Sequence, residues 1–331
     1  MDNFEQRKGN YGYSSEPQRS EHRITFHGNN MAFLGLSLYN LLLTTLTLGI
    51  YYPWAKCAIR KYLWQETEVA GSRLEWMGTG KEMFKGFIKA YLLLGGILFS
   101  FKIAPQIFPP FVAFIYVFVA SIVLLLLFPL IIHGAARYRL SRTSYRGIQF
   151  GYRGVIGEFY KKTLLDFFLT FITMGIYGFW FQTNLRTYVM KHSRFGSVSG
   201  KFTGTGGELF GLSIVQSILT AITFYIYLPW AIIKLMKFDI ENTGLVQNEK
   251  DYFFKSDATG GGYFIELLKA VFLTVFTLGI AAPVGELMIH RYIVNSLSID
   301  GGFDFDQVQQ TEEAYSDATG DDMGDIMDFD F

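Results

Sequence analysis

The sequence predicts an all-α integral membrane protein with about six transmembrane helices, formed by five tandem repeats of about 50 residues. Three observations predict this class: an apolar composition, long runs without charge, and a recurring spacing of landmark residues. The chain has 331 residues, of which 50% are hydrophobic and 18% aromatic, and its mean hydropathy is +0.23. This composition is more apolar than a soluble domain needs.

The charges are balanced overall but are segregated along the chain. The formal net charge is +0, with basic residues after the apolar runs and an acidic C-terminus. A nucleic-acid partner is therefore not expected. We expect residues 1–22 to form a disordered polar tail without a cleaved signal peptide, and residues 303–331 to form a disordered acidic tail. The single cysteine, Cys57, excludes an internal disulfide.

Landmark residues recur with a period of about 50 residues. An aromatic-x-Gly entry occurs four times, with aromatic residues at 26, 76, 152 and 202, and in degenerate form at 254. A turn marker follows at Pro53, Pro129, Phe179, Pro229 and Pro283, and an aromatic residue lies nine positions after each marker. The predicted units are 23–73, 74–149, 150–200, 201–251 and 252–302.

The second unit is longer than the others by about one membrane crossing with its turn. It holds two apolar runs, Met83 to Ile103 and Phe111 to Ile132. Residues 28–55 and 209–233 carry no charged side chain, whereas Asp166 lies near the start of the run 164–185. With a last run at 270–285, the count of predicted spans is six.

A short basic helix is predicted after each turn marker. In the first unit Lys56, Arg60 and Lys61 fall on one half of a helical wheel, opposite an apolar half. We expect these helices to lie in the plane of the headgroups, because central Lys and Arg side chains are costly in hydrocarbon. The alternative is that each helix returns across the bilayer and lines a polar interior, which would place all basic segments on one face.

These helices supply the candidate contacts, and the bilayer and its anionic lipids are the expected partners, since each basic residue near such a surface contributes about 1 kcal/mol. The candidate lipid-headgroup or substrate contacts are Lys56, Arg60, Lys61, Arg137, Arg139, Arg186, Lys191, Lys234, Lys237 and Arg291. The candidate interface anchors are Tyr52, Trp54, Trp180 and Trp230. No protein partner can be named.

Catalytic and metal-binding patterns are not found in the sequence. The five His residues are scattered over different units, and Gly78-Thr79-Gly80-Lys81 does not have the spacing of a phosphate-binding loop. We therefore expect no enzyme activity, no cofactor and no metal site. Short polar pieces between the units, such as SRLEWMG and SGKFTG, predict small strands outside the membrane.

The segments FTGTGGELFGL and TLGIYYPWAKCAIRKYLW resemble the YjgN-like family of bacterial inner-membrane proteins over roughly residues 23–300. The resemblance implies a multi-pass protein of the bacterial inner membrane and supplies no activity. The third and fifth units depart from the pattern, with GIYGFW and LGIAAPV in place of GIYYPW.

Two functions remain open. A transporter or channel-like protein for an unidentified solute would bring charged residues together on a water-accessible cavity. The alternative is a non-catalytic membrane scaffold or envelope protein that engages anionic headgroups or partner proteins.

Overall fold

The computed structural model describes residues 21–311, in which the order strand, helix, helix, strand occurs five times. Residues 1–20 and 312–331, which make up most of the two predicted tails, lie outside the described residues. The elements are β1 (His22–Phe26), α1 (Asn30–Leu46), α2 (Tyr52–Gln65), β2 (Thr67–Val69); β3 (Ser72–Trp76), α3 (Gly80–Ile107), α4 (Pro110–Ser141), β4 (Thr143–Tyr145); β5 (Ile148–Tyr152), α5 (Ile156–Ile172), α6 (Gly178–His192), β6 (Ser193–Phe195); β7 (Val198–Phe202), α7 (Gly206–Ile222), α8 (Leu228–Glu241), β8 (Thr243–Gln247); β9 (Lys250–Ser256), α9 (Gly260–Phe276), α10 (Ala282–Asn295), β10 (Leu297–Ile299) and the 3-10 turn η1 (Phe305–Gln307).

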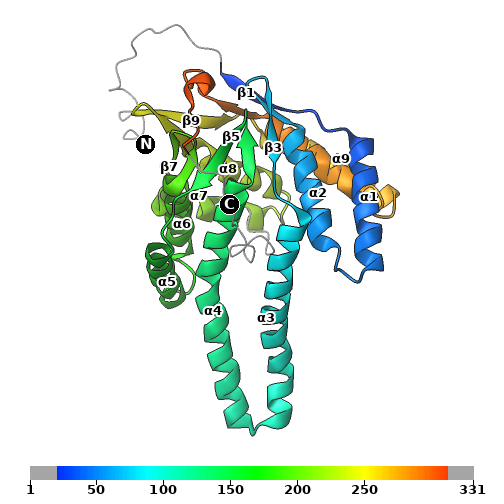
Figure 1. Cartoon of the computed structure of the whole chain (residues 1–331), viewed down its shortest axis with the longest axis vertical. Coiled ribbons are helices and arrows are strands. Elements are labelled where there is room, and N and C mark those ends of the chain that lie inside the picture. The colour runs from blue at the N-terminus through cyan, green and yellow to red at the C-terminus, as the bar shows by residue number, and fades with distance from the viewer. Residues whose placement is uncertain (1–20, 312–331) are drawn as a thin grey trace.

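The ten strands form one closed antiparallel barrel, in which each strand pairs with its neighbours in sequence and β10 pairs with β1. The strands before and after each pair of helices also pair, as in the register Phe26↔Thr67. Both ends of every helix pair are thus fixed at the barrel, so each pair is an antiparallel hairpin. Figure 1 shows the strands gathered at one end of the molecule, with the α3–α4 hairpin projecting farthest from them.

The prediction of an all-α protein with six spans is wrong. The structure contains the barrel, and within residues 21–311 only α3 and α4 have the length and composition to cross a membrane. The other apolar helices have 17 residues each. Each basic helix packs back along its apolar partner and leads into a strand. The small strands predicted from SRLEWMG and SGKFTG are present as β3 and β7, but their closure into one barrel was not predicted.

The aromatic-x-Gly entry closes each odd-numbered strand with a ring folded over the glycine. A Cβ atom at Gly28 would lie 2.4 Å from the ring of Phe26, and one at Gly154 would lie 2.4 Å from the ring of Tyr152. The glycine is therefore required by the close approach of the ring. In the fifth unit Ser256 pairs with Leu297 as Phe26 pairs with Thr67, so the entry there is Ser256-Asp257-Ala258 and not the Phe254-Lys255-Ser256 expected from the spacing.

The aromatic residue nine positions after the turn marker joins the two helices of a hairpin. The Tyr62 hydroxyl accepts a hydrogen bond from the backbone N–H of Asn29 (2.6 Å) and donates one to the carbonyl of Asn29 (2.9 Å). Asn29 is the residue that caps the start of α1. The same two bonds join Tyr188 to Val155 and Tyr292 to Thr259. In the second and fourth units a threonine–glutamate capping box satisfies this backbone N–H instead.

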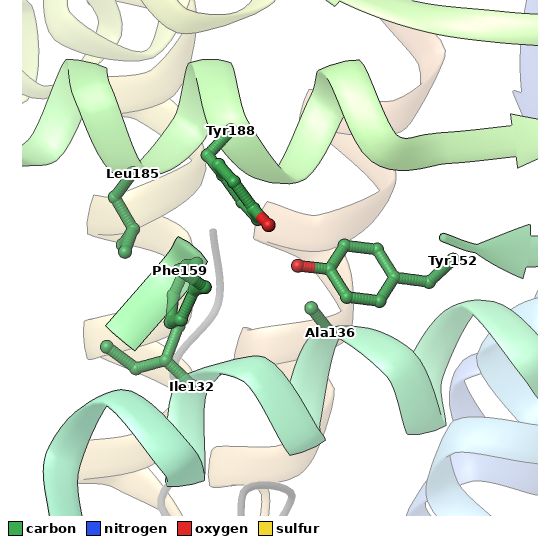
Figure 2. Close-up of a cluster of buried hydrophobic side chains, with 6 residues drawn as sticks. All are labelled: Ile132, Ala136, Tyr152, Phe159, Leu185 and Tyr188. Carbon is green, nitrogen blue, oxygen red and sulfur yellow. The ribbon is translucent and has the colours of Figure 1, made fainter. Parts of the chain in front are cut away.

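The boundary between the second and third units is filled by apolar side chains. The cluster comprises Ile132 and Ala136 of α4, Tyr152 of β5, Phe159 of α5, and Leu185 and Tyr188 of α6. Figure 2 shows these side chains converging, with the hydroxyls of Tyr152 and Tyr188 pointing toward one another. Ile132 and Ala136 of α4 are 1% and 9% exposed and pack against Phe159 of α5. These side chains join the second and third units through an apolar contact.

The end of the described chain covers the barrel mouth that faces away from the helices. Phe303 and Val308 are buried in the cluster that fills the barrel. The Arg146 guanidinium, from the β4–β5 turn, lies 2.6 Å from a carboxylate oxygen of Asp306, and the Gln247 side chain bonds both backbone groups of Asp304. Residues 303–311, assigned above to the acidic tail, are thus part of the folded barrel.

Two adjacent glycines in α7 test the contact between units. A Cβ atom at Gly206 would lie 2.4 Å from the indole and 2.6 Å from the Cα atom of Trp180, whereas one at Gly207 would meet nothing within 4 Å. We expect Gly206→Ala to lower the free energy of unfolding by about 1–3 kcal/mol because the neighbouring unit must move. Gly207→Ala should raise it by about 0.5–1 kcal/mol through helix propensity. Thermal unfolding in detergent measures both, and equal effects would contradict the packing described here.

Candidate functional site

Four of the five helical hairpins end in exposed apolar tips, which comprise residues 47–51, 173–177, 223–227 and 277–281. The side chains of Leu48, Met174, Phe224 and Leu278 are 94%, 93%, 88% and 93% exposed. Large apolar side chains exposed together on one end of a protein mark a surface that contacts lipid or another apolar partner.

The backbone of each tip is hydrogen-bonded within the tip. In the first unit the Thr47 hydroxyl donates to the carbonyl of Leu43 (2.7 Å) and accepts from the N–H of Tyr51 (3.0 Å), while the N–H of Gly49 bonds the carbonyl of Thr44 (2.7 Å). The corresponding threonines are Thr173, Thr223 and Thr277, with the same bonds. Turns in hydrocarbon must satisfy their polar groups internally, and each backbone N–H of residues 47–51 has a partner within the hairpin.

A cavity of about 1010 Å³ opens between α1, α2 and α10, with a contribution from the end of α4. Its charged lining consists of Lys56 and Arg60 from α2, Arg139 from α4 and Glu286 from α10; His290 of α10 also lines it. Among the described residues that line the cavity, three are basic and one is acidic. The charged residues come from three different units, so the cavity exists only in the closed ring.

Two pairs of lining residues occupy corresponding places in the first and fifth units. Lys56 and Arg60 lie three and seven positions after Pro53, and Glu286 and His290 lie three and seven positions after Pro283. Residues four apart in a helix share a face. The same face of two homologous helices thus contributes opposite charges to the cavity.

In four of the five units, the seventh residue after the turn marker contacts the entry aromatic of the next unit. The Arg60 guanidinium carbon lies 4.8 Å from the ring centroid of Trp76, and Arg60 is only 8% exposed. Arg186 lies over Phe202 in the same way, at 5.7 Å. A cation over an aromatic ring contributes about 0.5–2 kcal/mol, the most when desolvated. The ring also holds the guanidinium at the level of the cavity.

The remaining candidate residues from the sequence lie apart from this cavity. Arg186 pairs with Asp239 at 3.4 Å across the third and fourth units. Arg291 donates to the carbonyl of Gly28 and to the side chain of Asn30, both at 2.7 Å, across the fifth and first units. Lys61, Lys191 and Lys234 are exposed on the surface, while Arg137 and Lys237 are half-buried.

The tryptophans predicted as interface anchors pack between units. A Cβ atom at Gly80 would lie 2.3 Å from the Trp54 indole, and the pairs Trp180–Gly206 and Trp230–Gly260 are equally close. Tyr52 lies at the protein surface, with its ring 6.2 Å from that of Phe87. Each indole thus packs against the glycine that begins the first helix of the next unit.

The described part of the chain shows no group of three His, Cys, Asp or Glu side chains close enough to hold a metal ion. The Cys57 thiol is buried and donates to the carbonyl of Gly78 at 3.1 Å. This cysteine joins α2 to the entry of the second unit.

The sequence analysis did not assign Asn40, Glu286 or His290 to a site. A signal was present, because Glu286 and His290 follow Pro283 at the same spacing at which Lys56 and Arg60 follow Pro53. Aligning the five units by their turn markers would have shown that the four side chains occupy equivalent positions in two units.

Comparisons with known proteins identify relatives of this chain but no activity. The family model described as "Bacterial protein of unknown function (DUF898)" matches residues 21–203, 198–253 and 246–326. The inner membrane protein YjgN of Escherichia coli (strain K12) is 30% identical over 157 residues, which are 46% of this chain and 37% of that protein. YjgN of Salmonella typhimurium is 37% identical over 79 residues, which are 24% of this chain and 19% of that protein.

The matched regions thus span about a third or less of the length of these relatives. No solved structure matches the chain. Since the family model covers nearly all described residues, the chain belongs to the DUF898 family of bacterial proteins of unknown function, the family of the YjgN-like proteins.

Proposed function

We propose that this chain is a multi-pass protein of the bacterial inner membrane, in which the barrel stays at one face of the bilayer and the five hairpins enter the lipid from that face. The observation that carries the proposal is the construction of the tips. They combine apolar side chains up to 94% exposed with backbone N–H groups that are bonded internally, and hydrocarbon favours such internal bonding. The name of the YjgN relatives, inner membrane protein, supports the location.

The hairpin lengths suit two depths of insertion. A helix of 17 residues is about 25 Å long, which is less than the hydrocarbon thickness of about 30 Å. The helices α3 and α4, with 28 and 32 residues, are about 42 and 48 Å long and suffice to cross. In this proposal the long hairpin crosses the bilayer and the four short ones enter it without crossing.

The distribution of charge favours a cytoplasmic barrel. The four short tips contain no charged residue, whereas Arg60, Lys61, Arg186, Lys191, Lys237 and Arg291 lie in the half of their helix that is nearer the barrel. Lys and Arg near membrane segments are retained on the cytoplasmic side.

Among the two roles predicted from the sequence, we favour a non-catalytic protein that engages lipid. The barrel interior of the described residues is filled by an aromatic and aliphatic cluster, and Phe303 and Val308 close its outer mouth. A hydrophilic solute has no open route along that axis. The exposed surface of the hairpins, in contrast, is a large apolar area suited to lipid contact.

Transport of a solute is the second candidate, and the charged cavity between α1, α2 and α10 is the observation that favours it. A transporter of this architecture would move its solute between the hairpins and not through the barrel. Measurement of solute flux in proteoliposomes separates the two roles.

Reporter cysteines test the same-side arrangement. In a Cys57→Ser background, single cysteines replace the exposed barrel residues Arg73, Ser197 and Glu249, one in each of three units. We expect an impermeant maleimide to leave all three unlabelled in intact spheroplasts and to label all three in inverted vesicles. Labelling of some positions from each side would contradict the arrangement.

An asparagine at a tip tests whether the tips lie in lipid. The backbone φ angles of Leu48 and Met174 are 50° and 51°, a conformation that Asn tolerates better than Leu or Met. In water Leu48→Asn or Met174→Asn would therefore be neutral or stabilising. In lipid we expect each to lower stability in nanodiscs by about 1–3 kcal/mol, because the amide is left without partners.

The matched control for the tips is Glu249→Asn in the β8–β9 turn, an exposed residue with φ of 64°. It should be neutral or stabilising. Thermal unfolding midpoints in nanodiscs give the comparison, and stabilisation by all three substitutions would place the tips in water.

A further inference from the structure

Three polar atoms that line the cavity between α1, α2 and α10 have no hydrogen-bond partner among the described residues: the Ser37 hydroxyl, the Asn40 Nδ2 and the His290 Nε2. Asn40 is only 3% exposed. Buried polar groups are almost always paired, because folding removes their hydrogen bonds to water. These three atoms therefore define what a ligand of the cavity must offer.

The position of Asn40 in its unit is satisfied internally in two other units. Thirteen residues before the turn marker, three units carry a buried polar side chain, namely Asn40, Asp166 and Gln216. The hydroxyl of Tyr177 donates a hydrogen bond to the Asp166 carboxylate at 3.2 Å. In the same way the hydroxyl of Tyr227 donates to the Gln216 side chain at 3.1 Å. The first unit also has a tyrosine at this place in its tip, yet the Asn40 Nδ2 stays unpaired within residues 21–311. Of these three side chains, Asn40 is the one that needs a partner from outside its hairpin.

The charged residues of the lining do not specify the ligand. Lys56, Arg60 and Arg139 each already take part in other interactions, and Glu286 is exposed. The groups without a partner are instead an amide, a hydroxyl and an imidazole nitrogen. An amide N–H donates, and a hydroxyl or an imidazole can donate when an acceptor faces it. One or two acceptor oxygens would therefore satisfy all three groups.

The depth of Asn40 in the hairpin favours an uncharged acceptor. Asn40 lies ten residues after Asn30, the first residue of α1, and therefore about 15 Å along the helix from its barrel end. In the proposed arrangement this distance places the amide below the headgroups, within a hydrocarbon layer of about 30 Å. Bringing an ionised head to this depth costs far more than bringing a neutral carbonyl group. The acceptor that fits is a carbonyl oxygen of an uncharged molecule.

Most of the remaining lining is apolar and includes Phe33 and Leu41 of α1, Ile59 of α2, and the tip residues Leu278 and Ile280. Both tip residues are exposed, so the cavity opens at the surface that lipid would cover. The cavity volume of about 1010 Å³ lies at the upper end of the 300–1,000 Å³ that small-molecule pockets occupy. A carbonyl group on a long hydrocarbon chain matches both parts of the lining.

We infer that this cavity binds an uncharged membrane lipid through its carbonyl oxygens, with Asn40 as the buried donor and Ser37 and His290 as further donors. The inference rests on the proposed insertion of the hairpins into the bilayer, and it names the class of lipid that is engaged there. Fatty-acid esters of glycerol and quinones with a prenyl chain both carry carbonyl oxygens on a hydrocarbon chain. One probe of each kind distinguishes these two sources.

The test uses the full chain, delipidated in a maltoside detergent, which contains no carbonyl group. The probes are dioleoylglycerol, its diether analogue without carbonyl groups, and a ubiquinone with a short prenyl chain. We expect dioleoylglycerol or the quinone to raise the thermal unfolding midpoint and to be retained in native mass spectrometry. If dioleoylglycerol binds, its diether should bind about 3- to 10-fold more weakly, which is the effect of one lost hydrogen bond between neutral groups.

A matched pair of variants tests the role of Asn40. Asn40→Leu should weaken binding of the same probe about 3- to 10-fold and raise the midpoint of the delipidated protein, because an unpaired buried amide is replaced by an apolar side chain of similar size. The control is Gln216→Leu, at the equivalent position of the fourth unit and outside the cavity. It should change the affinity less than about 2-fold and lower the midpoint, because the Tyr227 hydroxyl loses its acceptor.

A second variant guards against misfolding. Ser37→Ala removes one donor from the same face of α1 without adding an atom, and it should weaken binding about 3- to 10-fold. Binding of dioleoylglycerol alone assigns the site to a glycerolipid, binding of the quinone alone assigns it to a quinone, and binding of both supports the class as a whole. If neither probe binds, as expected where water alone fills the cavity, the inference is overturned. Equal binding of dioleoylglycerol and its diether, or equal losses from Asn40→Leu and Gln216→Leu, would overturn it as well.

The two proposals fail in different ways. If the cysteine reporters lie on one side and the tips are lipid-exposed but no carbonyl lipid binds, the cavity inference is wrong and the membrane arrangement stands. If the reporters lie on both sides, the membrane arrangement itself is wrong.

Discussion

Closure of the barrel is the constraint on which the rest of the structure depends. Its strands have only three to seven residues, and a short pair of strands is not stable alone in water. Pairing of β1 with β10 removes both edges of the sheet and gives every strand two neighbours. Because each helical hairpin begins and ends in paired strands, the closed sheet fixes ten helix ends at once. The hairpins can then expose apolar surface without losing their arrangement.

The closed sheet is uniform around the ring, but the contacts between neighbouring units vary. At four of the five boundaries, the seventh residue after the turn marker contacts the entry aromatic of the following unit, yet the chemistry of that contact differs. It is a cation on an indole for Arg60 and Trp76, an edge-on pair of rings for His290 and Phe26, and a tight apolar core for Ala136 and Tyr152. The closed sheet keeps the units in place whichever side chains make these contacts. One boundary between units can therefore contain a cavity while another is filled by side chains.

Much of the local structure could be predicted from the sequence, but the arrangement of the five units around a closed barrel could not. Landmark residues such as Pro53 and Tyr62 are visible because they recur, and they lie at corresponding places in the structure. The barrel could not be predicted, because a strand such as Thr67–Val69 has too few residues to carry a period. The count of six spans failed because an apolar helix of 17 residues and its tip resemble a crossing. The cavity depends on side chains about 230 residues apart, which only the ring closure brings together.

The pairing of β10 with β1 brings together the two ends of the described chain, whereas the strands of each of the other nine pairs are connected by a continuous segment of chain. Its register comprises His22↔Ile299 and Arg23↔Ser298, and on the helix side Arg291 bonds Gly28 and Asn30 across it. The two ends of the described chain are therefore held together by non-covalent contacts alone, which also include the packing of Ile24 and Phe26 against Leu287 and Val294. This junction runs beside the cavity between α1 and α10, so a bulky molecule would reach that cavity sideways from the bilayer by separating these polar and apolar contacts, with every peptide bond left intact.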